Sequence, residues 1–367
     1  MKKETHNWLT DLRIALAIAW KDILEGWKNK VILTGVITSL FLVIFYNYLP
    51  ELTQDELPLM VIFDPNNHIT YEDTKCIYDL NYRVEKVEDT FFFVMRDIDT
   101  PVIGIKLEQD PKQTQATSPM VLEAYYPNWM RTRQIASVKT TAESTLQGCW
   151  GFPVEVAPEG NIVYPIMDNN ITGKIFIAST GLLLQLAVIG LSMAPQLIVE
   201  EKDARTLQAI VVSPATLGHF ILGKTLAVLF YVTLTTTIGL FFVGPLIVHW
   251  GLAIAALLIG MLTIITPGIM LGVLLDNKQQ IQIWMWVMFI PVVLPIFFSI
   301  VRELPDPLMK VVDWWPTVAL SRLLRAGFTL NPPVATYGIE IVYLLSLSVV
   351  LFAGTVWVIQ KRSAKGV

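Results

Sequence analysis

Long uninterrupted apolar runs constrain this chain more than any other feature of its sequence. A bilayer core about 30 Å thick is crossed by a helix of roughly 20 apolar residues. Runs of that length without central charges recur six times. They cover residues 31–49, 175–199, 220–248, 252–275, 281–301 and 339–359. Because 53% of the residues are hydrophobic and only 16% are charged, we predict a multi-pass, mainly α-helical membrane protein with six transmembrane helices.

Basic residues near the membrane predict its orientation. The first 30 residues contain six lysines and arginines, and the C-terminus carries Lys361, Arg362 and Lys365. We therefore expect both termini in the cytoplasm, residues 50–172 and 302–338 outside, and residues 200–219 inside. The outer loop 302–338 opposes this orientation, because it contains the basic residues Arg302, Lys310, Arg322 and Arg325. The first apolar run is not followed by a small-residue cleavage site, so we expect it to be a retained span rather than a signal peptide.

Residues 1–30 form a helical pattern ahead of the first span. Apolar residues recur there at helical spacing: Trp8, Leu12, Ala15, Leu16, Ala19, Trp20, Ile23 and Trp27. Charged residues lie largely between them, so we predict an amphipathic helix in the cytoplasmic membrane interface. The sequence leaves open whether this helix only anchors the first span, residues 31–49, or also contacts a cytoplasmic partner.

Residues 50–172 have the composition of a soluble domain and are numerous enough to bury a core. Strand patterns lie at 57–63, 101–107 and 120–126, and 129–146 has helical character. We therefore predict an inserted α/β extracytoplasmic domain. The two cysteines of the chain, Cys76 and Cys149, both fall in this domain, and the sequence leaves open whether they form a disulfide or stay free.

The remaining transmembrane domain is expected over residues 173–367, with a cytoplasmic segment at 200–217. After its fifth apolar run, two short apolar pieces at 308–312 and 318–328 are too short to span a bilayer. We expect them to lie at the outer interface or to dip into it, held by Trp314 and Trp315.

One string resembles the phosphate-binding loop of nucleotide hydrolases. Residues 218–225, GHFILGKT, match G-x-x-x-x-G-K-T. We reject this interpretation because the string follows Ser213-Pro214 rather than a buried strand and runs straight into an apolar span. Asp276, the aspartate that could serve a magnesium ion, lies at the end of another span. We expect Lys224 to snorkel to the inner membrane surface instead.

No acidic or basic residue lies near the centre of a predicted span. Such charges usually mark proton or ion relays, so their absence disfavours proton-driven secondary transport. The spans do contain amides and hydroxyls, which more often join helices than bind substrate. We note as candidate translocation-path residues Asn47, Gln185, Thr235, Thr236 and Thr266. We propose no catalytic residue, metal ligand or nucleic-acid contact.

The segment after the second span combines dense charge with a short apolar stretch. It carries Glu200, Glu201, Lys202, Asp203 and Arg205, followed by Thr206-Leu207, Ile210 and Ser213-Pro214. Charge beside a small apolar helix could engage a soluble partner protein. An ordinary loop with solvated charges would show the same composition, and the sequence favours neither.

Taken in order, these features resemble the permeases of type-2 ABC (ABC-2) exporters with a large outer domain between the first two spans. The resemblance covers nearly the whole chain and rests on the interfacial helix, Glu200-Glu201, Thr206-Leu207, Ser213-Pro214 and Gly223-Lys224. The outer-domain strands and the Trp315 to Arg325 stretch also resemble the family. The chain departs from the family at Arg205, where glycine is frequent.

The resemblance implies a permease subunit, not an enzyme, in a prokaryotic inner or plasma membrane. Two separate ATPase subunits would dock at residues 200–214 and use ATP and magnesium, while this chain binds no cofactor. A second permease, identical or related, would complete the path for efflux. The cargo would be hydrophobic or amphipathic, such as a drug, lipid or lipopeptide. Two rival hypotheses remain. One is a signalling permease that moves no solute, and the other is a secondary transporter.

Overall fold

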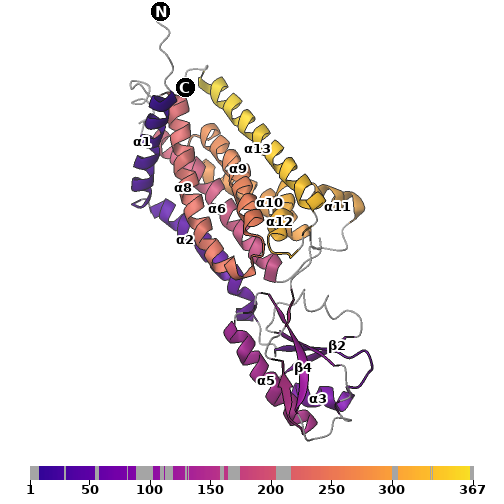
Figure 1. Ribbon diagram of the computed structural model, residues 1–367. Helices are drawn as coiled ribbons and strands as arrows, with labels where there is room; N and C mark the ends of the chain where they lie inside the picture. The colour runs from indigo at the N-terminus through magenta and orange to yellow at the C-terminus, as the bar shows by residue number, and fades with distance from the viewer. Residues whose placement is uncertain are drawn as a thin grey trace, which may run out of the picture.

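The computed structural model divides into a helix bundle and an α/β unit beyond one end of it (Figure 1). It describes residues 8–28, 30–53, 58–80, 82–87, 102–107, 111, 119–128, 130, 132–157, 161–163, 174–203, 216–299, 305–330, 332 and 334–363. Helix α1 and the last turns of the C-terminal helix α13 lie at the end of the bundle opposite the α/β unit. The prediction of a mainly helical membrane protein with an inserted α/β region is confirmed.

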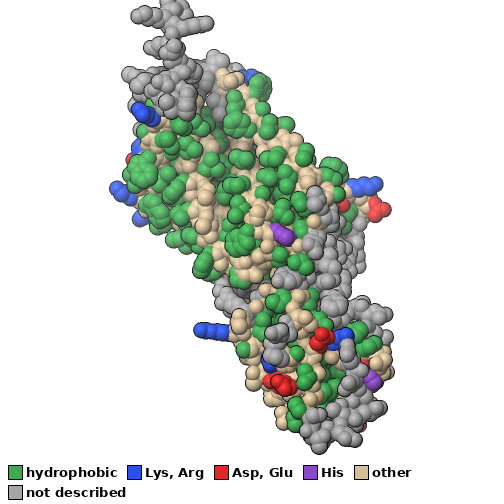
Figure 2. All heavy atoms as spheres, in the orientation of Figure 1, with side chains coloured by type: hydrophobic (Ala, Val, Ile, Leu, Met, Phe, Trp, Pro, Cys, Tyr) green, Lys and Arg blue, Asp and Glu red, His purple; other side chains and the backbone are tan. Residues whose placement is uncertain are grey.

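Each predicted span corresponds to a helix. The six are α2 (Lys30–Thr53), α6 (Lys174–Asp203), α8 (Leu217–Val243), α9 (Trp250–Leu274), α10 (Lys278–Phe298) and α13 (Val334–Ser363). Within the described residues, the last five are long and apolar enough to cross a membrane. In α2 the side chains that the structure describes include the apolar stretch Ile32–Phe45. The face of the bundle visible in Figure 2 is largely apolar, as a lipid-facing surface should be.

Helix α6 is the centre of the bundle and packs against α2, α8, α9, α10 and α12. Small residues allow its closest contact, with α9. A Cβ atom added to Gly268 would lie 2.2 Å from the carbonyl oxygen of Gly190 and 3.2 Å from the Cβ of Ala194. Because apolar side chains gain little by leaving lipid for one another, membrane helices associate through such close backbone packing.

The short apolar pieces between the fifth and sixth spans form two helices, α11 (Asp306–Asp313) and α12 (Pro316–Ala326). Helix α12 is buried and packs against α6, α9, α10 and α13, so this piece dips into the bundle. Arg322 of α12 lies 2.9 Å from Glu340 of α13 and 3.4 Å from Asp313. Arg325 is 2% exposed. Both arginines therefore lie against the bundle rather than in a solvated loop. They should not have been counted among the loop charges used to predict orientation.

Helix α1 (Trp8–Gly26) forms as predicted and lies lengthwise along the first half of α8. Its buried face consists of Ala15, Ala19, Asp22 and Gly26, at spacings of four, three and four residues. A second face exposes apolar side chains: Leu12, Leu16, Trp20, Leu24 and Trp27. Its placement at a membrane interface remains a prediction.

The α/β unit contains a mixed sheet. Its strands are β1 (Leu59–Phe63), β2 (Arg83–Val87), β3 (Val102–Lys106), β4 (Met120–Pro127), β5 (Val154–Val156) and β6 (Asn161–Val163). The strand order is β2-β1-β3-β4-β5, and β6 also pairs with β4. Strand β1 runs parallel to β2 and β3, while β3 and β4 are antiparallel. The three predicted strands are confirmed as β1, β3 and β4.

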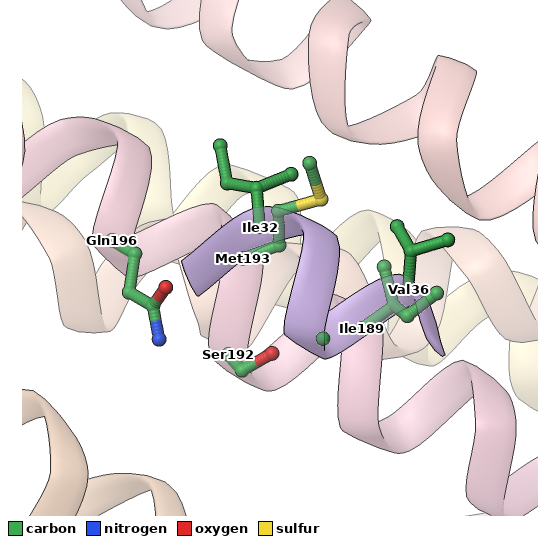
Figure 3. A pocket seen from close by; sticks show the side chains of 7 residues that line it. Ile32, Val36, Ile189, Ser192, Met193 and Gln196 are labelled. Carbon is green, nitrogen blue, oxygen red and sulfur yellow. The ribbon is translucent and has the colours of Figure 1, made fainter. Parts of the chain in front are cut away.

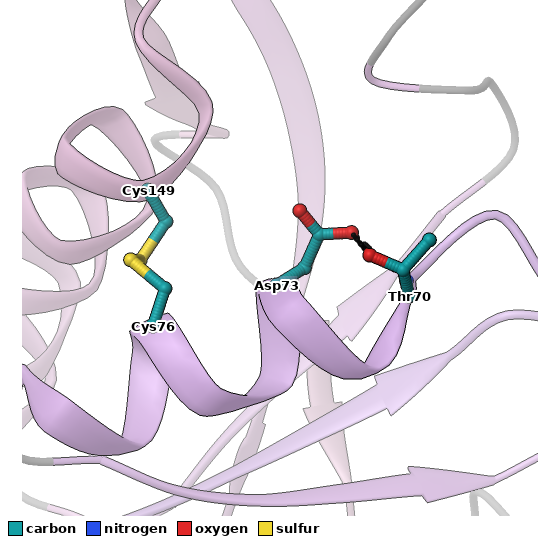
Figure 4. The surroundings of a disulfide bond; sticks show 4 residues. All are labelled: Thr70, Asp73, Cys76 and Cys149. Carbon is teal, nitrogen blue, oxygen red and sulfur yellow. Dashed lines mark hydrogen bonds between the residues drawn. A yellow bond between two sulfur atoms is a disulfide. The ribbon is translucent and has the colours of Figure 1, made fainter.

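Two helices of the α/β unit pack against this sheet, α3 (Tyr71–Asp79) and α5 (Thr132–Trp150). Figure 4 shows the disulfide that links Cys76 of α3 to Cys149 of α5, with the two Cα atoms 5.8 Å apart. Thr70 and Asp73 form a capping box at the start of α3. The disulfide therefore ties together two helices that are 73 residues apart in sequence.

Candidate functional site

Four consecutive charged residues end α6, and the first three of them contact four neighbouring helices. Glu200 lies 3.5 Å from Lys278 of α10. The Oε1 atom of Glu201 lies 3.1 Å from Lys224 of α8 and 3.2 Å from Lys21 of α1. Lys202 reaches the end of α9. The last turn of α6 therefore joins four helices at the end of the bundle opposite the α/β unit.

Lys202 caps the C-terminus of α9. Its Nζ donates to the carbonyls of Val273 at 2.9 Å and Leu275 at 2.7 Å, and it lies 3.3 Å from Asp276. The last carbonyls of a helix have no intrahelical donor, and a cation there also complements the helix dipole. This contact fixes the C-terminal end of α9 to α6.

Lys224 is buried rather than snorkelling, so the interpretation made from the sequence is wrong at this residue. Its side chain is 2% exposed and its Nζ lies 2.8 Å from Oδ1 of Asp22, itself 3% exposed. Burial raises the pKa of the Asp22 carboxyl above its ordinary value, although the neighbouring Lys224 acts in the opposite direction. A charge removed from water persists where a partner compensates it. Here Asp22 and Glu201, from two other helices, compensate Lys224.

The string at residues 218–225 lies in the first turns of α8. Thr216 caps this helix: its hydroxyl accepts from the amide of His219 at 3.3 Å, and its own amide donates to Nδ1 of His219 at 3.1 Å. The amide of His219 is capped by Thr216, and from Phe220 onward the amides bond to carbonyls four residues earlier, so they cannot converge on a phosphate. Asp276 contacts Lys202 rather than a neighbouring phosphate loop. The helical geometry is therefore incompatible with a nucleotide-binding loop.

The predicted coupling segment is described only in part. Arg205, Thr206, Leu207, Ile210, Ser213 and Pro214 lie outside the described residues. The structure does describe both flanks, Asp203 at the end of α6 and Thr216 at the start of α8. The segment therefore connects the last turn of α6 to the first turn of α8.

The candidate translocation-path residues differ in how their polar atoms are used. The hydroxyls of Thr235 and Thr266 donate to carbonyls of their own helices. Within the part of the chain that the structure describes, Thr236 and both amide atoms of Gln185 are buried without a hydrogen-bond partner. Gln185 lies against Gly239 of α8, where an added Cβ would be 2.5 Å from its Oε1. The side chain of Asn47 is outside the described residues.

A small pocket lies between α2 and α6, farther along α6 toward its charged end (Figure 3). Ile32, Gly35 and Val36 of α2 line one side. Ser192 and Gln196 are the polar residues among those that α6 contributes. Gln185 precedes Ser192 by two helical turns, so all three lie on one side of α6. This side of the central helix is more polar than a lipid-facing surface would be.

A comparison with family models matches residues 110–357 to the ABC-2 family transporter proteins. The match covers about two thirds of the chain, from the later part of the α/β unit through the last membrane-spanning helix. This chain belongs to the ABC-2 transporter family. No curated protein and no solved structure matches it. The ABC-2 assignment makes the chain a multi-pass permease subunit of an ABC transporter, a class that associates with ABC ATPase subunits, and not itself an enzyme.

Sequence reasoning identified Glu200, Glu201 and Lys202 in this ABC-2 permease but not their partners. Asp22 and Lys21 were assigned to the polar side of an interfacial helix, and Lys224 to the membrane surface. The one available signal was the placement of Asp22 in line with Ala15, Ala19 and Gly26, a stripe of small residues typical of close helix packing.

Proposed function

We propose that this permease is the membrane-spanning subunit of an ATP-driven exporter, with residues 200–214 as its ATPase-coupling segment. The observation that carries the proposal is the last turn of α6, where Glu200, Glu201 and Lys202 together contact α1, α8, α9 and α10. A force applied to the segment that follows this turn would be transmitted to four helices together. The spans supply no central charge relay, so the energy has to come from a partner.

In this proposal two ATPase subunits bind ATP and magnesium, and this chain binds neither. A second permease, identical or related, forms the other wall of the path. Gln185 and Thr236 are the best-supported path residues, because their buried polar atoms have no partner in the part of the chain that the structure describes. Asn47, Thr235 and Thr266 stay candidates of lower rank. The apolar spans favour a hydrophobic or amphipathic substrate.

The proposed orientation places the charged end of the bundle in the cytoplasm of a prokaryotic cell and the α/β unit outside. The Cys76–Cys149 disulfide supports this orientation, because disulfides persist in oxidising compartments. The shared position of α1 and the end of α13 supports placing both termini on the same side.

The test is co-purification of the candidate ATPase with the wild-type permease and with two variants, Glu201→Arg and Leu207→Asp. We expect both variants to insert in the membrane and to lose the ATPase. A Lys361→Met variant, altered at an exposed lysine over the Trp357 ring, is the matched control and should retain it. If the folded wild type never co-purifies with an ATPase, the proposal fails and secondary transport becomes the leading hypothesis.

A signalling permease is the second candidate, favoured by the α/β unit, which could bind an extracytoplasmic protein. ATP-dependent loss of a compound from cells supports export. Capture of a defined extracytoplasmic enzyme or receptor without any solute movement supports signalling instead.

A further inference from the structure

The Gly223-Lys224 pair of α8 is the place where α1 docks. A Cβ atom added to Gly223 would lie 2.7 Å from the Cβ of Ile18 and 2.9 Å from the carbonyl oxygen of Ala15. Only a glycine lets the two helix backbones approach this closely. The next residue, Lys224, then lies close enough to pair with Asp22 of α1 at 2.8 Å.

The ion pair at this contact is closed to solvent. Lys224 and Asp22 are 2% and 3% exposed, and Glu201 at the end of α6 is 13% exposed. One ammonium therefore bridges carboxylates from two helices that are far apart in sequence. Lys21 also contacts Glu201 but is half exposed, so its ion pair contributes less to holding α1 than that of Lys224. Removing only one partner of such a pair leaves a buried charge without compensation.

Contacts on both sides of Lys224 hold α1 parallel to α8. Near the start of α1, Asp11 lies 3.0 Å from His219. Near its end, the hydroxyl of Tyr231 donates to the carbonyl of Ile23 at 2.7 Å. The buried ion pair lies between these contacts and is the one that also includes α6.

We infer that Lys224 is a positioning residue that fixes α1 to the last turn of α6, so that α1 follows any displacement of the coupling segment. The inference rests on the proposed function in one respect, the assignment of residues 200–214 as the coupling segment. The docking of α1 by Lys224 can be tested on this chain alone.

The experiment compares the wild type with Lys224→Met, the double variant Asp22→Asn/Lys224→Met, and the control Lys361→Met. Each of these proteins also carries Asp11→Cys and His219→Cys, which a short bifunctional thiol reagent cross-links. The protein is not reduced beforehand, so that Cys76 and Cys149 stay joined to each other and do not react.

A second experiment measures movement of α1. Spin labels are attached at Leu16→Cys and Lys361→Cys in the wild type, in Lys224→Met and in the double variant. The distance between the labels is compared with the ATPase bound, before and after addition of ATP plus vanadate.

We expect Lys224→Met to lower the cross-linking yield about tenfold and the double variant to recover it, because the double variant leaves neither charge of the pair buried. The ATPase should co-purify with all of these proteins. The vanadate-induced change in distance should occur in the wild type and be lost in both Lys224→Met and the double variant, because neither keeps the ammonium that joins Asp22 of α1 to Glu201 of α6.

Two results would overturn the inference. One is wild-type cross-linking in a folded Lys224→Met protein. The other is a double variant that recovers the movement as well as the cross-linking, since α1 would then follow α6 without Lys224. Absence of the ATPase from the wild-type preparation would count against the proposed function. The cross-linking arm would still decide whether Lys224 holds α1.

Discussion

The indole nitrogen of Trp315 donates a hydrogen bond to the carbonyl oxygen of Pro291 at 2.6 Å. That carbonyl is the one that Pro295, four residues later in α10, leaves without an intrahelical donor. In a membrane-spanning helix an unpaired carbonyl is costly, and a neighbouring segment has to satisfy it. Trp315, just before α12, therefore attaches the proline-containing part of α10 to α12.

Replacing this donor tests the attachment. Trp315→Phe keeps the aromatic ring but removes the N–H group, so we expect a loss of about 1–3 kcal/mol in the free energy of unfolding. Thermal unfolding of the purified protein in detergent measures it. Trp314→Phe is the control, because Trp314 is 69% exposed and its replacement should have little effect. Equal effects of the two changes would contradict the role given to the indole.

Lys202 should stabilise the C-terminal end of α9. Lys202→Met removes the donor to Val273 and Leu275, and we expect a local loss of about 1–2 kcal/mol. Hydrogen exchange of the last turn of α9 is the measurement, and its protection should fall while that of the middle of α9 stays unchanged. Lys278→Met, which removes a more exposed ion pair with Glu200, should change protection far less. Unchanged exchange in Lys202→Met would contradict the capping role.

Close packing of α6 on α9 predicts that Gly268 tolerates no side chain. In Gly268→Ala the new Cβ would meet backbone at 2.2 Å, and we expect destabilisation of about 1–3 kcal/mol or more. Gly354→Ala is the matched control, since a Cβ there meets nothing within 4 Å and alanine favours a helix by roughly 1 kcal/mol. The two variants should shift the melting temperature in opposite directions, and parallel shifts would refute the packing argument.

Asp64 should make the α/β unit sensitive to acid. Burial alone would raise the pKa of this carboxyl, but the amides of Ile69 and His68 and the ammonium of Lys86 outweigh burial, so its pKa lies below the ordinary value. A carboxyl with a depressed folded-state pKa stabilises the fold above its unfolded pKa of about 4 and loses that contribution as pH falls through the folded value.

The matching experiment compares unfolding of the wild type and Asp64→Asn across pH. The wild type should be more stable by about 1–3 kcal/mol at neutral pH, and the difference should shrink below about pH 4. Glu85→Gln, at an exposed position of β2, should show no such dependence. A difference that is constant down to pH 2 would contradict the role of the charge.

The disulfide should contribute directly to the stability of the α/β unit. Replacing both Cys76 and Cys149 by serine removes a constraint between residues 73 positions apart, and we expect a loss of about 2–5 kcal/mol. Thermal unfolding checks the loss, and a mobility difference between reduced and unreduced wild type on a gel checks the bond itself. If the thiols of the freshly purified protein react fully with an alkylating reagent, the bond is absent.

The prediction from sequence was most accurate where a single local property decides the outcome. A run of about 20 apolar residues has to cover its backbone polar groups within itself, so span positions follow from composition alone. Strands β1, β3 and β4 alternate or bury strongly apolar residues and were predicted. Strands β2, β5 and β6 were missed, because β5 and β6 have only three residues each and β2 carries three charged side chains among its five residues.

Charged residues were the main source of error. Arg322 and Arg325 were counted as loop charges, yet Arg325 is buried and Arg322 is partly buried and paired with Glu340 of α13. Lys224 was placed at the membrane surface, yet Asp22, 202 residues away in sequence, keeps it inside. Whether a charge is solvated or paired depends on what the fold brings within about 4 Å of it, and sequence spacing does not report that distance.

The sequence by itself determined that this chain is a multi-pass helical membrane protein with an inserted α/β unit and a charged segment after α6. Apolar length and strand pattern are local, and they hold whichever helices become neighbours. Only the tertiary structure decided that α6 lies at the centre, that α12 folds into the bundle, and that Lys224 joins α1 to α6. These outcomes depend on contacts between distant residues, whose free energies arise only when the helices are packed together.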